Sequence, residues 1–189
     1  MGKIVGNFFI SLDGVVERPD QWHFPYFDDE MGEVVGAGMA SAAAWLMGRR
    51  LYDEWSRYWP PNADDHQFGT FINDIPKYVL SDSLAGADWR NTTLVRGPEA
   101  VERLRRVKAE TDGDIGMSGS ATTVRWLLAN GLLDELGLLL HPIAVGHGQR
   151  LFEDTPTTPL RLIGSRTLST GVLHLTYAPD PTPPAAGPR

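Results

Sequence analysis

The chain has 189 residues, 42% of them hydrophobic, a length that predicts one compact domain without room for a second. Its formal net charge is −7, from 17 basic and 24 acidic residues, and no basic run stands out, so no nucleic-acid partner is predicted. It contains no cysteine, which excludes disulfides and thiolate metal sites, and no secretory signal or membrane-length apolar stretch, so we expect a cytoplasmic protein without membrane contact.

The first half of the chain predicts two strands separated by a loop and a helix, followed by further helical segments. The turn signal Asp13-Gly14 closes the first strand, and acidic residues begin the first helix, where the helix dipole favours them. In chain order we expect a strand, an ordered loop, a helix, a short strand and two helical segments over 3–12, 15–26, 28–43, 44–47, 49–58 and 68–73.

The second half alternates strands and helices and ends in a hairpin. We expect strands over 77–81, 92–96, 114–118, 136–145, 160–168 and 172–177, and helices over 98–110 and 120–130. Pro98 is expected at the first position of its helix and Gly131 just after the end of the other. This order predicts an α/β fold with a mostly parallel sheet and an antiparallel edge. The domain spans 1–179, and the Pro-rich segment 180–189 is predicted to be a disordered tail.

Two strand-to-helix turns have the composition of a phosphate site. Gly119-Ser120-Ala121-Thr122 begins a helix with small side chains, so its backbone N–H groups are open to an anion that the helix dipole also favours. Gly48-Arg49-Arg50 begins another helix with two guanidinium groups suited to bidentate phosphate contacts. Each alone is a weak signal, because such turns are often only turns. Together they predict a phosphate-bearing cofactor.

Other chemistries fit these residues less well. Gly116-Met117-Ser118 begins like the nucleophile turn of a serine hydrolase, with Asp134 and His141 downstream, but Ser120 replaces the final glycine. His141 and His147 lack the spacing of zinc ligands, so no metal site is predicted.

Seven segments, in order, resemble the reductase domain of bacterial riboflavin biosynthesis and its stand-alone relatives, which share the dihydrofolate reductase fold. They cover roughly residues 3 to 178 and are 11–14 (SLDG), 47–52 (MGRRLY), 77–81 (KYVLS), 119–122 (GSAT), 133–136 (LDEL), 141–146 (HPIAVG) and 150–152 (RLF).

The resemblance implies an NADPH-binding reductase that transfers hydride to a small organic acceptor. By position, the residues implied to hold the cofactor are Leu12, Asp13 and Gly14 beside the nicotinamide, Gly48, Arg49, Arg50, Leu51 and Ser81 on the adenosine side, and Gly119, Ser120, Ala121 and Thr122 around the pyrophosphate. Asp82 stands where relatives often carry arginine. Its carboxylate would repel a 2′-phosphate, so NADH is a possible alternative to NADPH.

The resemblance leaves the acceptor and the proton donor open. Asp28 and Asp29 lie where dihydrofolate reductase places its catalytic acid, although both also suit a helix N-terminus. Residues in position to meet a flat substrate, such as a pterin, flavin or pyrimidine, are Trp22, Phe24, Tyr26, Trp55 and His147, although such aromatics are more often core. A homodimer is expected from the relatives. A domain that binds nucleotide without catalysis is the alternative, because fold does not fix function.

Overall fold

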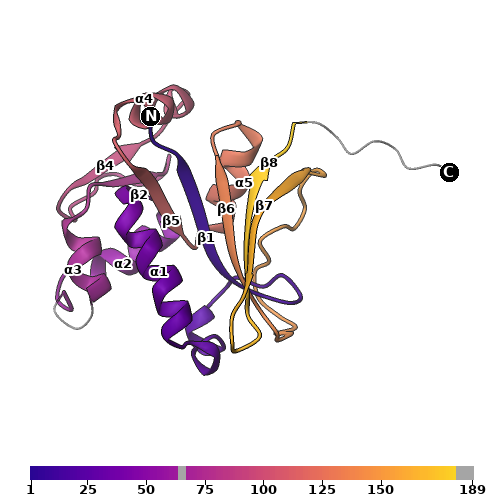
Figure 1. The fold of residues 1–189 in the computed structure, drawn as a ribbon. Helices are drawn as coiled ribbons and strands as arrows, with labels where there is room; N and C mark the ends of the chain where they lie inside the picture. Colours follow the sequence, from indigo (N-terminus) through magenta and orange to yellow (C-terminus); the bar gives the residue numbers. More distant parts are fainter. Residues whose placement is uncertain (64–66, 182–189) are drawn as a thin grey trace.

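Strands and helices alternate along the chain (Figure 1), in a computed structural model that describes residues 1–63 and 67–181. The strands are β1 (Ile4–Ser11), β2 (Ala42–Gly48), β3 (Lys77–Leu80), β4 (Thr92–Val95), β5 (Asp114–Ser118), β6 (Glu135–His141), β7 (Leu160–Thr167) and β8 (Leu173–Pro179). The helices are α1 (Asp29–Ser41), α2 (Arg49–Tyr58), α3 (Gln67–Asp74), α4 (Ala100–Glu110) and α5 (Ala121–Ala129), with 3₁₀ turns η1 (Pro19–Gln21) and η2 (Phe24–Tyr26).

All eight strands form one sheet in the order β4-β3-β2-β5-β1-β6-β8-β7. The first six are parallel, whereas β8 runs antiparallel to both β6 and β7. The hairpin turn is closed by Leu168, whose N–H donates to the Val172 carbonyl at 2.8 Å, with Gly171 at φ 83°. The predicted α/β fold with a mostly parallel sheet and a C-terminal antiparallel hairpin is therefore confirmed.

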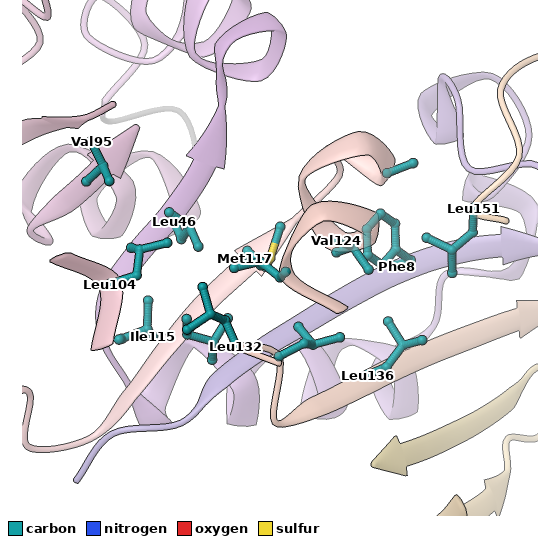
Figure 2. Packing of buried hydrophobic residues seen from close by; sticks show 14 of the residues in the cluster. Phe8, Leu46, Val95, Leu104, Ile115, Met117, Val124, Leu132, Leu136 and Leu151 are labelled. Atoms are coloured by element: carbon teal, nitrogen blue, oxygen red, sulfur yellow. The ribbon is translucent and has the colours of Figure 1, made fainter. Parts of the chain in front are cut away.

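The sheet is covered on both faces. In Figure 1, α1 crosses in front of the sheet and α5 lies behind it. The largest buried cluster joins alternate strand residues such as Ile4 and Phe8 of β1 to Leu104 of α4 and Val124 of α5 (Figure 2). A second buried cluster, which includes Trp45 and Met47 of β2, lies on the other face of the sheet. These two residues alternate along β2 with residues of the first cluster, and successive side chains of a strand point to opposite faces. Burial on both faces is typical of parallel strands.

Several predicted boundaries are wrong, for identifiable reasons. Helix α1 ends at Ser41 rather than near residue 43, because Ala42 is already extended. From Ala42 onward β2 pairs with β5, and this pairing overrides the helix preference of alanine. Strand β6 ends at His141, not at 145, since Pro142 has no N–H to continue the ladder. Pro98 precedes α4 instead of beginning it.

Other local predictions fare better. The loop over 15–26 is ordered and contains η1 and η2. Gly131 follows α5 in the left-handed region at φ 63°, where a helix-terminating glycine is expected. Of the predicted tail, residues 182–189 lie outside the described part of the chain. Among the described residues, no helix combines the length and apolarity needed to cross a bilayer.

Candidate nucleotide-binding cleft

The carboxyl ends of β3, β2 and β5 lie side by side, and a cleft of about 590 Å³ opens along this rim. Ligand sites of open α/β sheets lie at such ends. Nine of the residues predicted to hold a cofactor line the cleft: Gly48, Arg49, Arg50, Leu51, Ser81, Gly119, Ser120, Ala121 and Thr122. The structure therefore brings together turns that are separated by more than thirty residues of sequence.

Two helix N-termini meet in the cleft. Helix α2 begins after Gly48 and α5 after Ser120, and the Gly48 N–H donates to Ser120 Oγ at 3.2 Å. Gly119 and Ser120 both lie in the left-handed region, at φ 65° and 57°. The first-turn N–H groups of both helices have no partner within their own helix, and both dipoles present positive charge here.

Close packing explains the glycine at position 48. A Cβ added there would meet Thr123 Oγ1 and would lie 3.1 Å from Ser120 Oγ. Only glycine therefore allows the two helix starts to approach each other. The resulting set of backbone donors has the form of a phosphate-binding site, and these residues fit the diphosphate of a dinucleotide.

Each arginine of the α2 start already has partners. Arg49 donates to Asp53 at 3.1 Å and, through Nη1, to Ser83 O and Oγ at 2.9 Å each. Arg50 donates to Glu17 Oε1 at 2.8 Å, an interaction that holds the pKa of the Glu17 carboxyl below its usual value. Both guanidinium groups remain exposed, so a ligand phosphate has access to them.

Asp82 lies on the same wall of the cleft as Arg49. Its Oδ1 accepts a hydrogen bond from the Gly97 N–H at 2.7 Å, which joins the turns after β3 and β4. Ser81, one residue earlier, is buried and accepts from the N–H groups of Ser83 and Leu84. Ser81 therefore shapes this turn, while Asp82 adds a negative charge to the cleft.

The turn after β1 lies apart from the cleft lining. Asp13 accepts hydrogen bonds from Ser11 Oγ (2.6 Å), Val145 N (3.0 Å) and Gly146 N (2.8 Å), and these contacts hold the pKa of the Asp13 carboxyl well below its usual range. Asp13 thus organises two loops. Leu12 is exposed, and the predicted contacts of residues 12–14 with a nicotinamide remain a prediction.

The two predicted acids lie outside the cleft lining. Asp28 caps α1: Oδ1 accepts from the Met31 N–H at 2.9 Å, and Oδ2 accepts from Ser169 Oγ at 2.9 Å. Asp29 is exposed in the first turn of the same helix. The cap accounts for Asp28 without a catalytic role, so proton donation by either residue stays a prediction.

The five residues predicted to meet a substrate also lie outside this lining. Trp22 is buried, with its Nε1 donating to the Glu17 carbonyl at 3.2 Å. Tyr26 packs against a third buried cluster, and Trp55 against the second. Phe24 and His147 are exposed. Trp22, Tyr26 and Trp55 are therefore accounted for by packing.

A buried aromatic cluster stands behind Phe24. His23 stacks on Phe9 with ring centroids 4.4 Å apart, and His141 is surrounded by aromatic rings including Trp22 and Tyr26. His23 Nδ1 and His141 Nε2 are buried without hydrogen-bond partners. Burial lowers the pKa of both imidazoles, that of His23 to about 4.

Sequence reasoning missed Glu17, Gln149 and Trp126, which all line the cleft. Trp126 follows the glycine turn on α5, so its place near the cleft is readable from helical spacing. Glu17 and Gln149 come from loops that meet only in the tertiary structure, and no local pattern marks them.

The arrangement excludes a serine hydrolase built on Ser118. Asp134 directly precedes β6 and His141 ends it, so the two residues lie about 23 Å apart at roughly 3.3 Å per residue. Asp134 instead pairs with Lys108 at 2.6 Å and accepts from the Ile4 N–H. His141 and Ser118 are also separated by the intervening strand β1.

Known proteins share this fold along the whole chain. A candidate riboflavin biosynthesis protein from Shewanella sp. PV-4 superposes with a TM-score of 0.74 at 21% identity, covering 95% of this chain and 99% of its own. A pyrimidine reductase-like protein from Corynebacterium diphtheriae gives 0.64 at 15% identity, covering 95% and 92%. At such identities the likeness establishes the fold.

Sequence comparison gives the family. YyaP, an uncharacterised protein of Bacillus subtilis (strain 168), is 27% identical over 180 residues, which are 93% of this chain and 94% of YyaP. The family model of the RibD C-terminal domain matches residues 2–174. Because that match spans nearly the whole chain, the protein belongs to the RibD C-terminal domain family.

Proposed function

We propose that this protein is an NADPH-dependent reductase that transfers a hydride to a small organic acceptor. One observation carries the proposal: two helix N-termini and two arginines converge on a single cleft at the carboxyl rim of the sheet. Membership of a family named for a riboflavin-pathway domain, and the reductase-like description of the C. diphtheriae protein, support the same reaction class.

The cleft divides the binding work between backbone and side chains. The first-turn N–H groups of α5, after Gly119 and Ser120, would hold the diphosphate, and Arg49 and Arg50 would add charge-assisted contacts. When bound, the reduced nicotinamide supplies the hydride. Asp82 adds a negative charge beside Arg49, so NADH is included as a second donor.

We assign the acceptor to flat heterocycles of the pterin, flavin or pyrimidine kind. Support comes from the exposed face of Phe24, which lies over His23 with ring centroids 4.2 Å apart, and from the pyrimidine reductase-like neighbour. We also propose a homodimer formed by the edge strand β7, where Leu162 and Ile163 are exposed. Sedimentation of Leu162→Lys against the unaltered protein tests the dimer: a monomeric variant is the expected result.

A nucleotide-binding domain without catalysis is the second candidate. The specific observation in its favour is the position of Asp28 and Asp29, which do not line the cleft. Turnover separates the two functions. A catalyst oxidises NADPH and reduces a suitable pterin, flavin or pyrimidine, whereas a binding domain binds NADPH and reduces none of these acceptors.

A fluorescence titration tests nucleotide binding directly. Trp126 lines the cleft, so a bound nicotinamide nucleotide should quench its emission. We expect saturation at micromolar NADPH, and loss of most of the signal in Trp126→Phe while calorimetry still detects binding. Equal responses to NADPH and NADH, saturating only at millimolar concentrations, would contradict the proposal.

A further inference from the structure

Arg50 differs from the other two arginines of the cleft in the origin of its acidic partner. Arg18 pairs with Asp20 two residues away, and Arg49 pairs with Asp53 on the next turn of α2. Arg50 instead pairs with Glu17, which lies 33 residues earlier, at 2.8 Å. This ion pair therefore links two separate walls of the cleft.

The wall that carries Glu17 is a two-stranded ribbon of residues 14–17 and 149–151. Val16 N donates to Gln149 O at 2.9 Å, and Leu151 N donates to Gly14 O at 2.9 Å. Glu17 takes part through its second oxygen, which accepts from Gln149 N at 3.0 Å. The ribbon borders the cleft through Val16, Glu17 and Gln149.

The strength of the Glu17–Arg50 pair suits a contact that a ligand can replace. The Arg50 side chain is 76% exposed and that of Glu17 29% exposed. Ion pairs this close to solvent contribute little stability, whereas a phosphate makes a bidentate contact with a guanidinium. A dinucleotide phosphate arriving at the α2 start would therefore compete with the Glu17 carboxylate on favourable terms.

We propose that Glu17 is an internal competitor that occupies the Arg50 guanidinium in the nucleotide-free protein and is displaced by the diphosphate of the ligand. Displacement frees the ribbon from α2, so ligand binding and the position of the ribbon are coupled. The inference rests on the proposed function, because it assigns Arg50 to the phosphate of the nucleotide.

Calorimetric titrations with inorganic pyrophosphate and with NADPH test this competition. Glu17→Gln removes the charge, while its amide oxygen still accepts from Gln149 N. We expect the Kd for both ligands to fall about three- to fivefold, the size of an exposed ion pair. Asp20→Asn removes a charge from the same cleft without touching Arg50 and should change the Kd less than twofold. In an Arg50→Gln background, Glu17→Gln should have no effect.

The results distinguish the competition by Glu17 from the proposed nucleotide-binding function on which it rests. An unchanged or raised Kd in Glu17→Gln, with tight binding by the unaltered protein, overturns the competition alone. Failure of the unaltered protein to bind either ligand overturns the proposed function and the competition together. Thermal unfolding verifies that the variant is folded, and Glu17→Ala, which also loses the contact with Gln149, should tighten binding in the same direction.

Discussion

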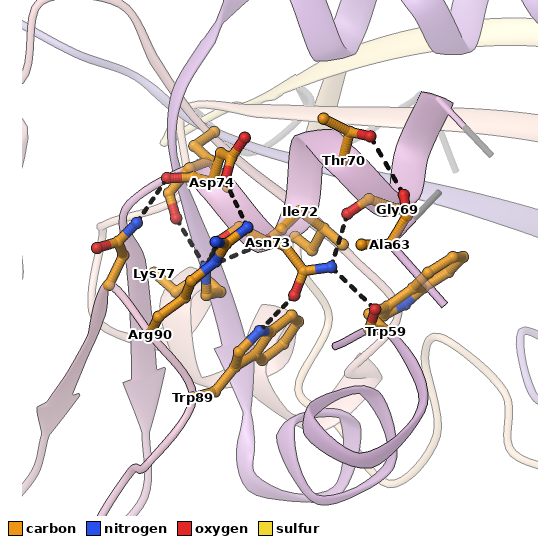
Figure 3. A network of polar contacts seen from close by, with 12 residues as sticks. Trp59, Ala63, Gly69, Thr70, Ile72, Asn73, Asp74, Lys77, Trp89 and Arg90 are labelled. Carbon is orange, nitrogen blue, oxygen red and sulfur yellow. Dashed lines mark hydrogen bonds and ion pairs between the residues drawn. The ribbon is translucent and has the colours of Figure 1, made fainter. Parts of the chain in front are cut away.

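Two polar networks of this protein have opposite characters. The first joins α3 to β3 and the segment around Trp89 (Figure 3). In it, Lys77 is 1% exposed and donates to the carbonyls of Ile72 (2.9 Å), Asn73 (3.2 Å) and Ile75 (2.8 Å). The Asn73 amide donates to two further carbonyls and accepts from Trp89 Nε1 at 2.8 Å. Every one of these polar groups has its partner inside the protein.

The second network surrounds the cleft and leaves capacity for a ligand. Its arginines are exposed, Arg50 held by one carboxylate and Arg49 by one carboxylate and Ser83. The helix starts beside them carry first-turn N–H groups without helical partners. Structural polar residues can therefore be distinguished from binding residues by their exposure and by whether their hydrogen bonds are complete. Buried groups whose hydrogen bonds are complete stabilise the fold, whereas exposed groups at convergent helix starts are available to bind.

Lys77 is the residue of the first network whose loss should destabilise the protein most. Burial lowers the pKa of Lys77 to about 8, so the ammonium is still protonated at pH 7 and caps the end of α3. Lys77→Met leaves three carbonyls without their donor and should lower the unfolding free energy by about 3–5 kcal/mol. Urea denaturation measures this. Lys3→Met removes an exposed pair with Glu135 and should cost less than about 1 kcal/mol. Similar losses in both variants would contradict the comparison.

The aromatic cluster around His23 is an intermediate case, buried but incompletely hydrogen-bonded. Burial lowers the pKa of His23 from 6.5 to about 4. Between pH 6.5 and 4 the unfolded chain binds a proton at this imidazole that the folded protein excludes. The unfolding free energy therefore decreases as the pH falls through this range, by about 3 kcal/mol in total. His23→Phe preserves the stacking on Phe9 without titrating. It should therefore flatten the dependence of unfolding free energy on pH between 6.5 and 4.

A matched substitution controls for the aromatic change at position 23. His147→Phe introduces the same aromatic ring at an exposed position outside the cluster, so it shows what the substitution itself does to the unfolding free energy. A residual slope in His23→Phe is expected from His141, whose pKa is also lowered by burial. An unaltered slope in His23→Phe would assign the acid sensitivity elsewhere.

The comparison also explains what the sequence reveals. The sheet, the hairpin and the turns at Gly48 and Gly119 follow from local composition, because glycine and helix-start residues act where they stand. Glu17 carries no such signal, since its partners Arg50 and Gln149 lie 33 and 132 residues away. The partners of Lys77 lie within five residues, but they are backbone carbonyls, which every residue has and which therefore leave no mark in the sequence. The expected helix at Ala42 and Ala43 is wrong because pairing of β2 with β5, not intrinsic preference, makes this segment a strand.

Breaking the second network should affect binding and spare stability. Arg49→Gln combined with Arg50→Gln removes both guanidinium groups from the cleft, and we expect the Kd for NADPH to rise about 10- to 100-fold, or about 1.4–2.7 kcal/mol. The melting temperature should change little, because both side chains are exposed. Calorimetry and thermal unfolding together test this, with Arg105→Gln, exposed on α4, as the control. A large fall in melting temperature with unaltered affinity would make the arginines structural.

The charge of Asp82 should have a smaller influence, on the relative affinity of the cleft for NADPH and NADH. Asp82→Asn removes the negative charge but retains an oxygen that accepts from the Gly97 N–H. We expect NADPH to bind about three- to fivefold more tightly and NADH to be unaffected, because only NADPH brings a further phosphate near this carboxylate. The ratio of the two Kd values is the measurement. Equal gains for both nucleotides would mean that Asp82 acts on the shared diphosphate, and unchanged Kd values for both would remove Asp82 from nucleotide binding altogether.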